Sequence, residues 1–252
     1  METWVLLRGL TRESAHWGRF PEQLRGRLPG ARVLAIDIPG NGRLWQVQSP
    51  DRIEATTESC RQQLRALGIE PPYRLLAMSL GAMIAVDWAD RHPGELDGCV
   101  LINTSLRGFS PWYRRLRPAS YGTLLSLLLS ADPARREQQI LQLTSSHPPA
   151  AMTEAIDAWT AIRKTRPVSG ANALRQLLAA MRYRAPARAP AVPLLVLVSR
   201  RDALVDARCS LRLAHEWKAS LGEHPSAGHD LPLDDGCWVA EQVAAHAFFS
   251  RQ

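Results

Sequence analysis

One short stretch, residues 73–85, limits the possible fold more than any other part of the sequence. An apolar run ends abruptly at Ser79, small residues follow, and a helical pattern then continues to His92. This pattern predicts a buried strand, a sharp turn and a helix. Strand and helix nearly touch at such a turn, so only small side chains fit two residues before and two residues after the serine. Ala77 and Gly81 occupy those two positions.

The five residues A-M-S-L-G match the pattern of a nucleophile elbow, in which a strained turn holds a serine hydroxyl clear of the sheet. Alone the match is weak, because short patterns recur by chance and an ordinary strand–helix turn would explain it. A serine hydroxyl is a poor nucleophile at neutral pH and needs a base that is oriented by a third group. The interpretation therefore depends on whether an acid and a histidine follow at other strand ends.

The chain alternates apolar strands with amphipathic helices. Six strands are predicted, at residues 3–7, 32–38, 73–78, 98–103, 193–199 and, more weakly, 221–224. Further helices are predicted at 51–67, about 207–219 and 237–249. Continuous apolar strands separated by helices indicate a mostly parallel sheet with helices on both faces. The predicted fold class is therefore α/β.

Residues 107–192 break this alternation. They contain four proline-separated segments with helical spacing, at 124–129, 136–143, 152–162 and 173–181. We interpret residues 107–192 as a helical cap, inserted before the strand at 193–199 into a core formed by residues 1–106 and 193–252. The insertion holds 13 basic and 4 acidic residues, so it carries the positive excess of a chain whose net charge is +7.

The composition, 46% hydrophobic and 22% charged, is ordinary for a globular enzyme. No apolar run approaches the roughly 20 residues that cross a bilayer. The first residues lack a basic region, so we expect a first strand, no signal peptide and a cytoplasmic protein. Cys60, Cys99, Cys209 and Cys237 lack metal-ligand spacing, and free thiols are expected. No metal or organic cofactor is implied.

Three candidate catalytic residues follow predicted strands, at the edge where open parallel sheets hold their ligands. Ser79, Asp202 and His229 follow the third, fifth and sixth strands. Serine, then acid, then histidine is the chain order expected after a nucleophile elbow. His229 would take the proton of Ser79, and Asp202 would hold the other ring nitrogen.

Each assignment has an alternative. Asp202 could cap a helix or form a surface ion pair, and Asp206 competes with it but lies where the next helix should open. His229 competes with six other histidines. It alone combines a preceding glycine, a following proline (Pro232) and the right chain order.

The backbone N–H groups of Leu80 and Leu10 are predicted to form an oxyanion hole. Leu80 follows the nucleophile, and Leu10 lies in the loop after the first strand. Gly9 leaves room for a substrate to approach that loop, and Ser105 is expected to be a polar lining residue, not a second nucleophile. Four residues are thus predicted to line the substrate site: Arg8, Gly9, His16 and Ser105.

Together these features resemble the α/β-hydrolase superfamily over about residues 3–106 and 193–249. Four motifs agree: R-G-L at 8–10, D-I-P-G-N-G at 37–42, the elbow at 77–81, and Asp202 with His229. The insertion is similar to the cap of the carboxylesterase and prolyl-iminopeptidase branch. The chain most resembles the short pimeloyl–acyl-carrier-protein methyl ester esterases. The resemblance implies a serine hydrolase whose sheet lacks the first two of the family's eight strands.

Two departures from the family pattern stand out. Ala77 replaces the first elbow glycine, a substitution that the packing argument tolerates. Arg8 replaces the usual histidine before the oxyanion-loop glycine. It puts a positive charge near the oxyanion site unless Glu13 or Asp37 neutralises it.

We therefore expect cleavage of a carboxylic ester through a Ser79 acyl-enzyme. Alternatives are acyl transfer, thioester or lactone hydrolysis or prolyl aminopeptidase activity on the same triad, and a non-catalytic member that binds through its cap. The cap arginines either form a solvated surface or recruit an anionic partner, such as an acidic ester or an acyl group on an acidic carrier protein. Charge alone leaves a membrane surface open, but nucleic acid is not expected, because few aromatic residues lie between the basic ones.

Overall fold

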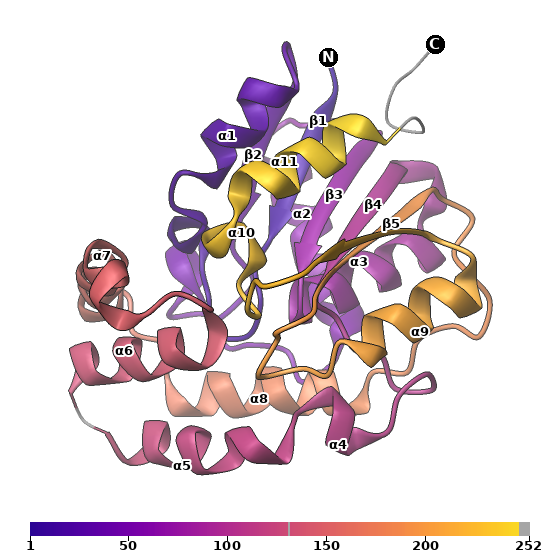
Figure 1. Ribbon diagram of the computed structural model, residues 1–252. Helices are drawn as coiled ribbons and strands as arrows, with labels where there is room; N and C mark the ends of the chain where they lie inside the picture. The colour runs from indigo at the N-terminus through magenta and orange to yellow at the C-terminus, as the bar shows by residue number, and fades with distance from the viewer. Residues whose placement is uncertain (131, 247–252) are drawn as a thin grey trace.

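The computed structural model describes residues 1–130 and 132–246 and has a parallel sheet at its centre (Figure 1). The six strands are β1 (Thr3–Leu7), β2 (Arg32–Ile36), β3 (Tyr73–Met78), β4 (Leu96–Ile102), β5 (Leu194–Ser199) and β6 (Ser220–His224). They lie in the order β2-β1-β3-β4-β5-β6, and every neighbouring pair is parallel. Strand β1 lies between β2 and β3, so the strand order reverses there. Open α/β sheets hold their ligands at the carboxyl ends of the strands beside such a reversal.

Helices cover both faces of the sheet, and the predicted α/β class is confirmed. Helices α1 (Phe20–Arg27), α10 (Leu231–Asp234) and α11 (Gly236–Ala245) pack on one face. Helices α2 (Ile53–Ala66), α3 (Leu80–Arg91) and α9 (Arg208–Trp217) pack on the other.

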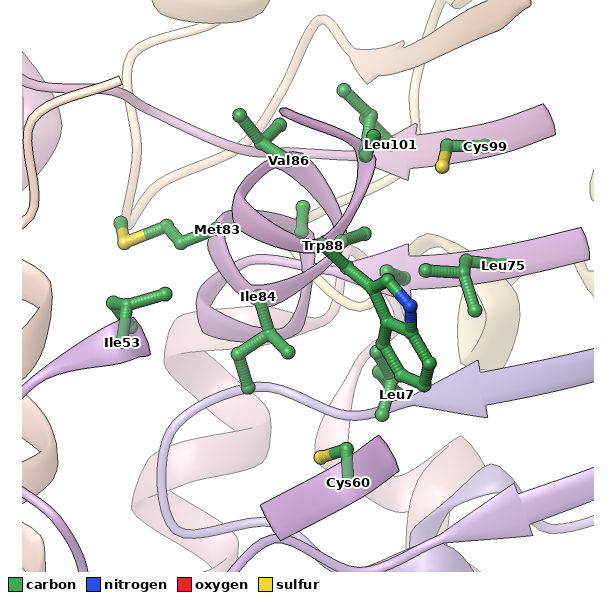
Figure 2. Packing of buried hydrophobic residues seen from close by; sticks show 14 of the residues in the cluster. Leu7, Ile53, Cys60, Leu75, Met83, Ile84, Val86, Trp88, Cys99 and Leu101 are labelled. Carbon is green, nitrogen blue, oxygen red and sulfur yellow. The ribbon is translucent and has the colours of Figure 1, made fainter. Parts of the chain in front are cut away.

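Alternate residues of each strand supply the two hydrophobic cores. Trp4 and Leu6 face α1 and α11, whereas Leu7 and Leu75 face α3. Figure 2 shows this second core, with Trp88 extending from α3 toward Leu7 and Leu75. Burial on both faces explains why the strands read as continuous apolar runs in the sequence.

The segment between β4 and β5 folds into helices that lie together beyond one end of the sheet (Figure 1). They are α4 (Trp112–Arg115), α5 (Tyr121–Leu129), α6 (Pro133–Thr144), α7 (Thr153–Thr165) and α8 (Gly170–Arg182). The four helices expected there are confirmed, and each extends beyond its predicted range at one end or both. The short helix α4 was not predicted. We refer to residues 107–192 as the insertion.

Element boundaries differ from the predictions by a few residues. Strand β2 ends at Ile36 instead of residue 38, because its partner β1 ends at Leu7, which pairs with Ile36. Strand β4 begins at Leu96, two residues early, and α11 ends at Ala245. The helix predicted at 237–249 also included His246, which is not helical, and residues 247–249, which lie outside the described residues.

All four cysteines have free thiols, and three of them are buried. Within residues 1–130 and 132–246, we find no helix that combines the length and the apolar character needed to cross a membrane.

Candidate active site

The turn at Ser79 has the backbone geometry of a strained strand–helix junction. Ser79 has φ 55° and ψ −115°, a left-handed conformation that a side-chain-bearing residue adopts only where its surroundings impose it. Its N–H donates to the carbonyl of Ile102 at 2.9 Å, and its carbonyl accepts from the N–H of Ala82 at 3.1 Å. A Cβ on Gly81 would lie 2.4 Å from the carbonyl oxygen of Leu7, so only glycine fits there.

The loop after β1 lies against this turn. A Cβ built on Gly9 would be 3.2 Å from Cβ of Ser79 and 3.7 Å from its Oγ. The loop then turns sharply, because the N–H of Arg12 donates to the carbonyl of Gly9 and Thr11 adopts a φ of 56°. The backbone around Leu10 is therefore held next to Ser79. This is where the sequence predicts the second oxyanion donor.

Asp202 and His229 form a buried hydrogen-bonded pair. Nδ1 of His229 lies 2.7 Å from Oδ2 of Asp202, and both side chains are almost fully buried. The other carboxylate oxygen accepts the backbone N–H groups of Leu204 and Val205, each at 2.8 Å. Burial acts to lower the pKa of His229, but the charge and hydrogen bond of Asp202 outweigh it and raise that pKa above its ordinary value. Asp202 thus orients the ring and favours its protonated form.

Asn103 and Thr104 connect the serine turn to the histidine loop. Nδ2 of Asn103 donates to the carbonyl of His229 at 2.8 Å and to Oγ of Ser199 at 2.9 Å. The next residue, Thr104, donates its hydroxyl to the carbonyl of Ser79 at 3.2 Å. Our sequence reasoning gave Asn103 no role. Its polar side chain directly after a buried central strand was the available signal.

Within the described part of the chain, Oγ of Ser79 and Nε2 of His229 do not share a hydrogen bond. Their backbones are nevertheless anchored by the adjacent residues Asn103 and Thr104. Catalytic hydrogen bonds are often long in an unliganded site and shorten when substrate binds.

The charge of Arg8 is neutralised by Asp230. Its guanidinium donates to both carboxylate oxygens of Asp230, at 2.9 and 2.6 Å, and lies 4.8 Å from the ring centroid of Trp17. Glu13 and Asp37, the two carboxylates that could have neutralised Arg8, bind other groups. The pair joins the loop after β1 to the residue that follows His229.

His16 and Ser105 are also held by the protein. Nδ1 of His16 accepts the N–H of Glu13 at 3.0 Å, and burial, with Arg12 and Arg8, lowers the pKa of the ring well below its ordinary value. The hydroxyl of Ser105 donates to a carbonyl of α4 at 3.4 Å. A substrate-binding role for Arg8, His16 or Ser105 stays a prediction.

The insertion contacts the loops that carry these residues. Oε1 of Gln176, on α8, accepts the N–H of Thr11 at 2.9 Å, and its Nε2 donates to Asn41 at 2.7 Å. At the end of α6, the carbonyl of Thr144 accepts the N–H of Asp230 at 2.7 Å. The oxyanion-loop candidate and the histidine loop therefore each have a partner in the insertion.

The acid loop, which carries Asp202, is also held by residues of the insertion. Arg117 donates to the carbonyl of Asp202 at 2.8 Å, and the hydroxyl of Ser120 donates to the carbonyl of Ala203 at 3.0 Å. Asp206, the competing acid, instead accepts the N–H and side chain of Arg208 where α9 begins. Among the residues described, no group of three or more His, Cys, Asp or Glu side chains could hold a metal ion.

Comparisons with known proteins agree with the α/β fold. The chain is 31% identical over 133 residues to the pimeloyl-[acyl-carrier protein] methyl ester esterase of Neisseria meningitidis, a match that covers 52% of this chain and 49% of that protein. The enol-lactonase from Burkholderia xenovorans superposes with a TM-score of 0.77 at 18% identity, covering 99% of this chain and 92% of the other. A thermophilic esterase from Thermogutta terrifontis gives 0.74 at 20% identity, covering 96% and 88%.

The two structural likenesses show the fold alone, and the relative from Neisseria is matched over about half its length. The match to a family model is broader. A model described as serine aminopeptidase, S33, matches residues 2–235. The chain therefore belongs to the serine aminopeptidase S33 family, within the α/β-hydrolase superfamily.

Proposed function

We propose that the protein hydrolyses a carboxylic ester through an acyl-enzyme formed on Ser79. One observation carries the proposal: a buried Asp202–His229 pair, with a 2.7 Å hydrogen bond, at the same sheet edge as a serine forced into positive φ. A strained serine conformation costs on the order of 1–3 kcal/mol and persists at functional sites. A helix cap at Asp202 alone would not require the histidine contact.

Each residue has a defined part in the reaction. Nδ1–H of His229 donates to Asp202, which leaves Nε2 free to accept the proton of Ser79 as Oγ attacks the ester carbonyl. When the tetrahedral intermediate collapses, the C–O bond to the alcohol breaks, and His229 passes the proton to the leaving oxygen. A water molecule, deprotonated by His229, then attacks the acyl-enzyme and releases the acid and Ser79.

The negative oxygen of the intermediate is stabilised by the N–H groups of Leu80 and Leu10. Leu80 is the first residue of α3, so its N–H has no partner one turn earlier in the helix and carries the positive end of the helix dipole. Gly9 lets the substrate approach Leu10, because a side chain at Gly9 would crowd Ser79. Fixed donors of this kind contribute about 2.7–4 kcal/mol to the stability of the transition state.

A fluorophosphonate probe tests the proposal directly. The wild type should be labelled and should hydrolyse p-nitrophenyl esters, with an optimum acyl length set by the insertion. Ser79→Ala should do neither, whereas Ser59→Ala, on α2, should behave as wild type. Labelling of Ser79→Ala, or turnover by it at the wild-type rate, would remove Ser79 from the mechanism.

The substrate class follows from the charge of the insertion. Arg163, Arg166 and Arg182 are paired with carboxylates. Five other arginines of the insertion are exposed: Arg107, Arg117, Arg135, Arg184 and Arg188. These exposed arginines would favour an acidic ester or an acyl group on an acidic carrier protein. The name of the relative from Neisseria supports the carrier, although the match covers half of each chain.

The same three residues would also serve acyl transfer, thioester or lactone hydrolysis, or prolyl aminopeptidase activity. The description of the family model names a serine aminopeptidase. A substrate panel containing a thioester, a lactone and a prolyl amide separates these reactions from ester hydrolysis. A protein that neither reacts with the probe nor turns over any panel member would instead be a binding member of the fold.

A further inference from the structure

A small cavity lies between the loop after β1 and the insertion helices α6 and α7. The cavity has a volume of about 10 Å³, which is room for one water molecule or one small anion. Its walls carry an unusual density of charge. The charged and titratable lining groups are Arg12, Glu13, His16, Glu137, Arg163 and Arg166.

Arg12 has a hydrogen-bond donor without a partner. Its Nη1 donates to Glu137 at 2.7 Å, but its Nη2 has no partner among the described residues. The side chain is 9% exposed and its guanidinium lies 4.3 Å from the ring centroid of Trp159. A buried donor without an acceptor costs about 1–3 kcal/mol, more when it is charged, so a group that accepts this hydrogen bond would bind favourably.

His16 supplies a second donor. Because its Nδ1 accepts the N–H of Glu13, a neutral ring carries its proton on Nε2. That nitrogen lies 3.1 Å from Nη1 of Arg12, which is itself a donor. Two donors therefore face each other, so the Nε2 proton has no acceptor there, and an acceptor in the cavity would supply one. Burial and neighbouring arginines lower the pKa of His16, which keeps the ring neutral.

The charges that line the cavity do not balance. Glu137 is shared by Arg12 and Arg163, and Glu13 is bound by Arg166. Three guanidinium groups thus face two carboxylates, and one positive charge is left over. Asp37 and Arg136 act on this cluster from outside the cavity with opposite signs.

We propose that this cavity binds a small anion, a halide or the carboxylate end of a small molecule, against Nη2 of Arg12 and Nε2 of His16. The anion completes both donors and neutralises the excess charge. Arg163 of the insertion also lines the cavity, so the anion would lie where the loop that carries Leu10 meets the insertion. The binding itself does not depend on the proposed ester hydrolysis.

Bromide, which scatters anomalously, tests the site in the Ser79→Ala protein. Crystals grown without halide and soaked in sodium bromide should show an anomalous peak within contact distance of Arg12 Nη2 and His16 Nε2. The peak should be lost in Arg12→Lys, which keeps the charge beside Glu137 but lacks the second donor. It should persist in Arg27→Lys, whose side chain lies in an exposed ion pair. A water molecule alone at the site would overturn the proposal.

Thermal unfolding at constant ionic strength checks that the site is occupied in solution. Exchange of gluconate, which is too large for the cavity, for bromide should raise Tm of the wild type and of Arg27→Lys. At bromide concentrations ten times Kd, the folded-to-unfolded ratio should rise about 11-fold. An equal Tm in bromide and in gluconate would contradict the proposal, and a bromide peak in the crystal would then mean binding at crystal concentration only. Because this measurement uses the wild type, it holds even if Arg12→Lys fails to fold.

Competition kinetics of the wild type identifies the source of the anion. Bromide that competes with a half-ester of a dicarboxylic acid, but not with a neutral ester of equal length, would assign the site to the carboxylate of the substrate. Equal effects on both esters would assign it to a free anion. This last arm alone needs the proposed function; failure of ester hydrolysis would leave the bromide results unchanged.

Discussion

Asp202 is the residue whose environment says most about the candidate chemistry. One carboxylate oxygen is fixed by two backbone N–H groups and the other binds His229. The raised pKa of His229 has its origin in this contact, which acts against burial. Because protonated His229 cannot accept the proton of Ser79, kcat/KM of the wild type should fall as pH drops through that raised pKa.

Asp202→Asn should therefore change both the rate and its pH dependence. Loss of the negative charge lowers the pKa of His229, so the acid limb of the profile should move to lower pH. The maximal rate should fall by about 10⁴-fold, because an amide can hold the wrong tautomer of the ring. Profiles of kcat/KM on a p-nitrophenyl ester measure both effects. Asp206→Asn is the matched control, and a similar change in it would refute the assignment.

Gly9→Ala tests the closeness of the first loop to Ser79. The added methyl group would lie 3.2 Å from Cβ of Ser79, tighter than ordinary contact, and must push the loop or the serine away. We expect kcat to fall by at least 10-fold with little change in secondary structure by circular dichroism. Gly26→Ala, in α1, meets nothing within 4 Å and should stabilise the fold by about 0.5–1 kcal/mol. Unchanged kcat in Gly9→Ala would place the oxyanion site elsewhere.

The buried Arg8–Asp230 ion pair should stabilise the fold as well as hold the loop after β1 in place. Both side chains are 3% exposed, so Asp230→Asn leaves a buried guanidinium without its counter-charge. The free energy of unfolding in urea should fall by about 3–5 kcal/mol. The double variant Arg8→Met with Asp230→Leu should recover much of this loss, since neither charge remains. The exposed pair of Arg27 and Glu241 is the comparison, and its removal should cost about 0–1 kcal/mol.

At the scale of elements, the positions of the inner strands along the chain could be predicted because β1, β3, β4 and β5 are almost entirely buried on both faces. Continuous apolar runs such as Leu194–Ser199 are a strong signal. The serine, acid and histidine candidates could be located from strand ends for the same reason. Short helices such as α4 and α10 were missed because four residues carry too little periodicity to detect.

Long-range polar contacts could not be predicted. Arg8 and Asp230 are 222 positions apart, and nothing in the local sequence around either residue identifies the other as its partner. Glu137 was one of four acidic residues in a basic segment, and it gave no sign that it would be buried between Arg12 and Arg163. Such pairs depend on how the insertion packs against the core, which local patterns do not encode.

Helix α8 offers a test of how the insertion supports the candidate site. Gln176→Ala removes the acceptor of the Thr11 N–H and the donor to Asn41. Because Asn41 is buried and Thr11 is partly buried, stability should fall by about 1–3 kcal/mol, and the Thr11 amide should exchange hydrogen faster. A lower kcat with little change in KM would show that the loop is mispositioned. Gln62→Ala, an exposed change on α2, should leave exchange and kcat unaltered.

At the scale of the whole molecule, the insertion both holds the loops of the candidate site in place and presents a positively charged surface. It binds the loops after β1, β5 and β6 through Gln176, Arg117 and the end of α6. Motion of the insertion would therefore displace the oxyanion loop, the acid loop and the histidine loop together. The ion pairs of Arg12 with Glu137 and of Arg166 with Glu13 strengthen this attachment.

The exposed arginines of the insertion lead to a prediction about salt. If the charge excess attracts an anionic ester or an acyl group on an acidic carrier, kcat/KM for that substrate should fall as ionic strength rises. Salt screens charges beyond about 8 Å at physiological ionic strength, so the effect should be clear between low salt and 0.5 M salt. A neutral ester of the same length should show no such fall.

Charge reversal separates recruitment from catalysis. Arg184→Glu with Arg188→Glu should weaken the salt dependence for the anionic substrate and lower its kcat/KM at low salt, with kcat unchanged. The neutral ester should be unaffected, because neither residue is near Ser79 in the proposed mechanism. Equal salt dependence for both esters would leave the basic residues as a solvated surface. The ester-hydrolysis proposal would stand, but its preference for an anionic substrate would not.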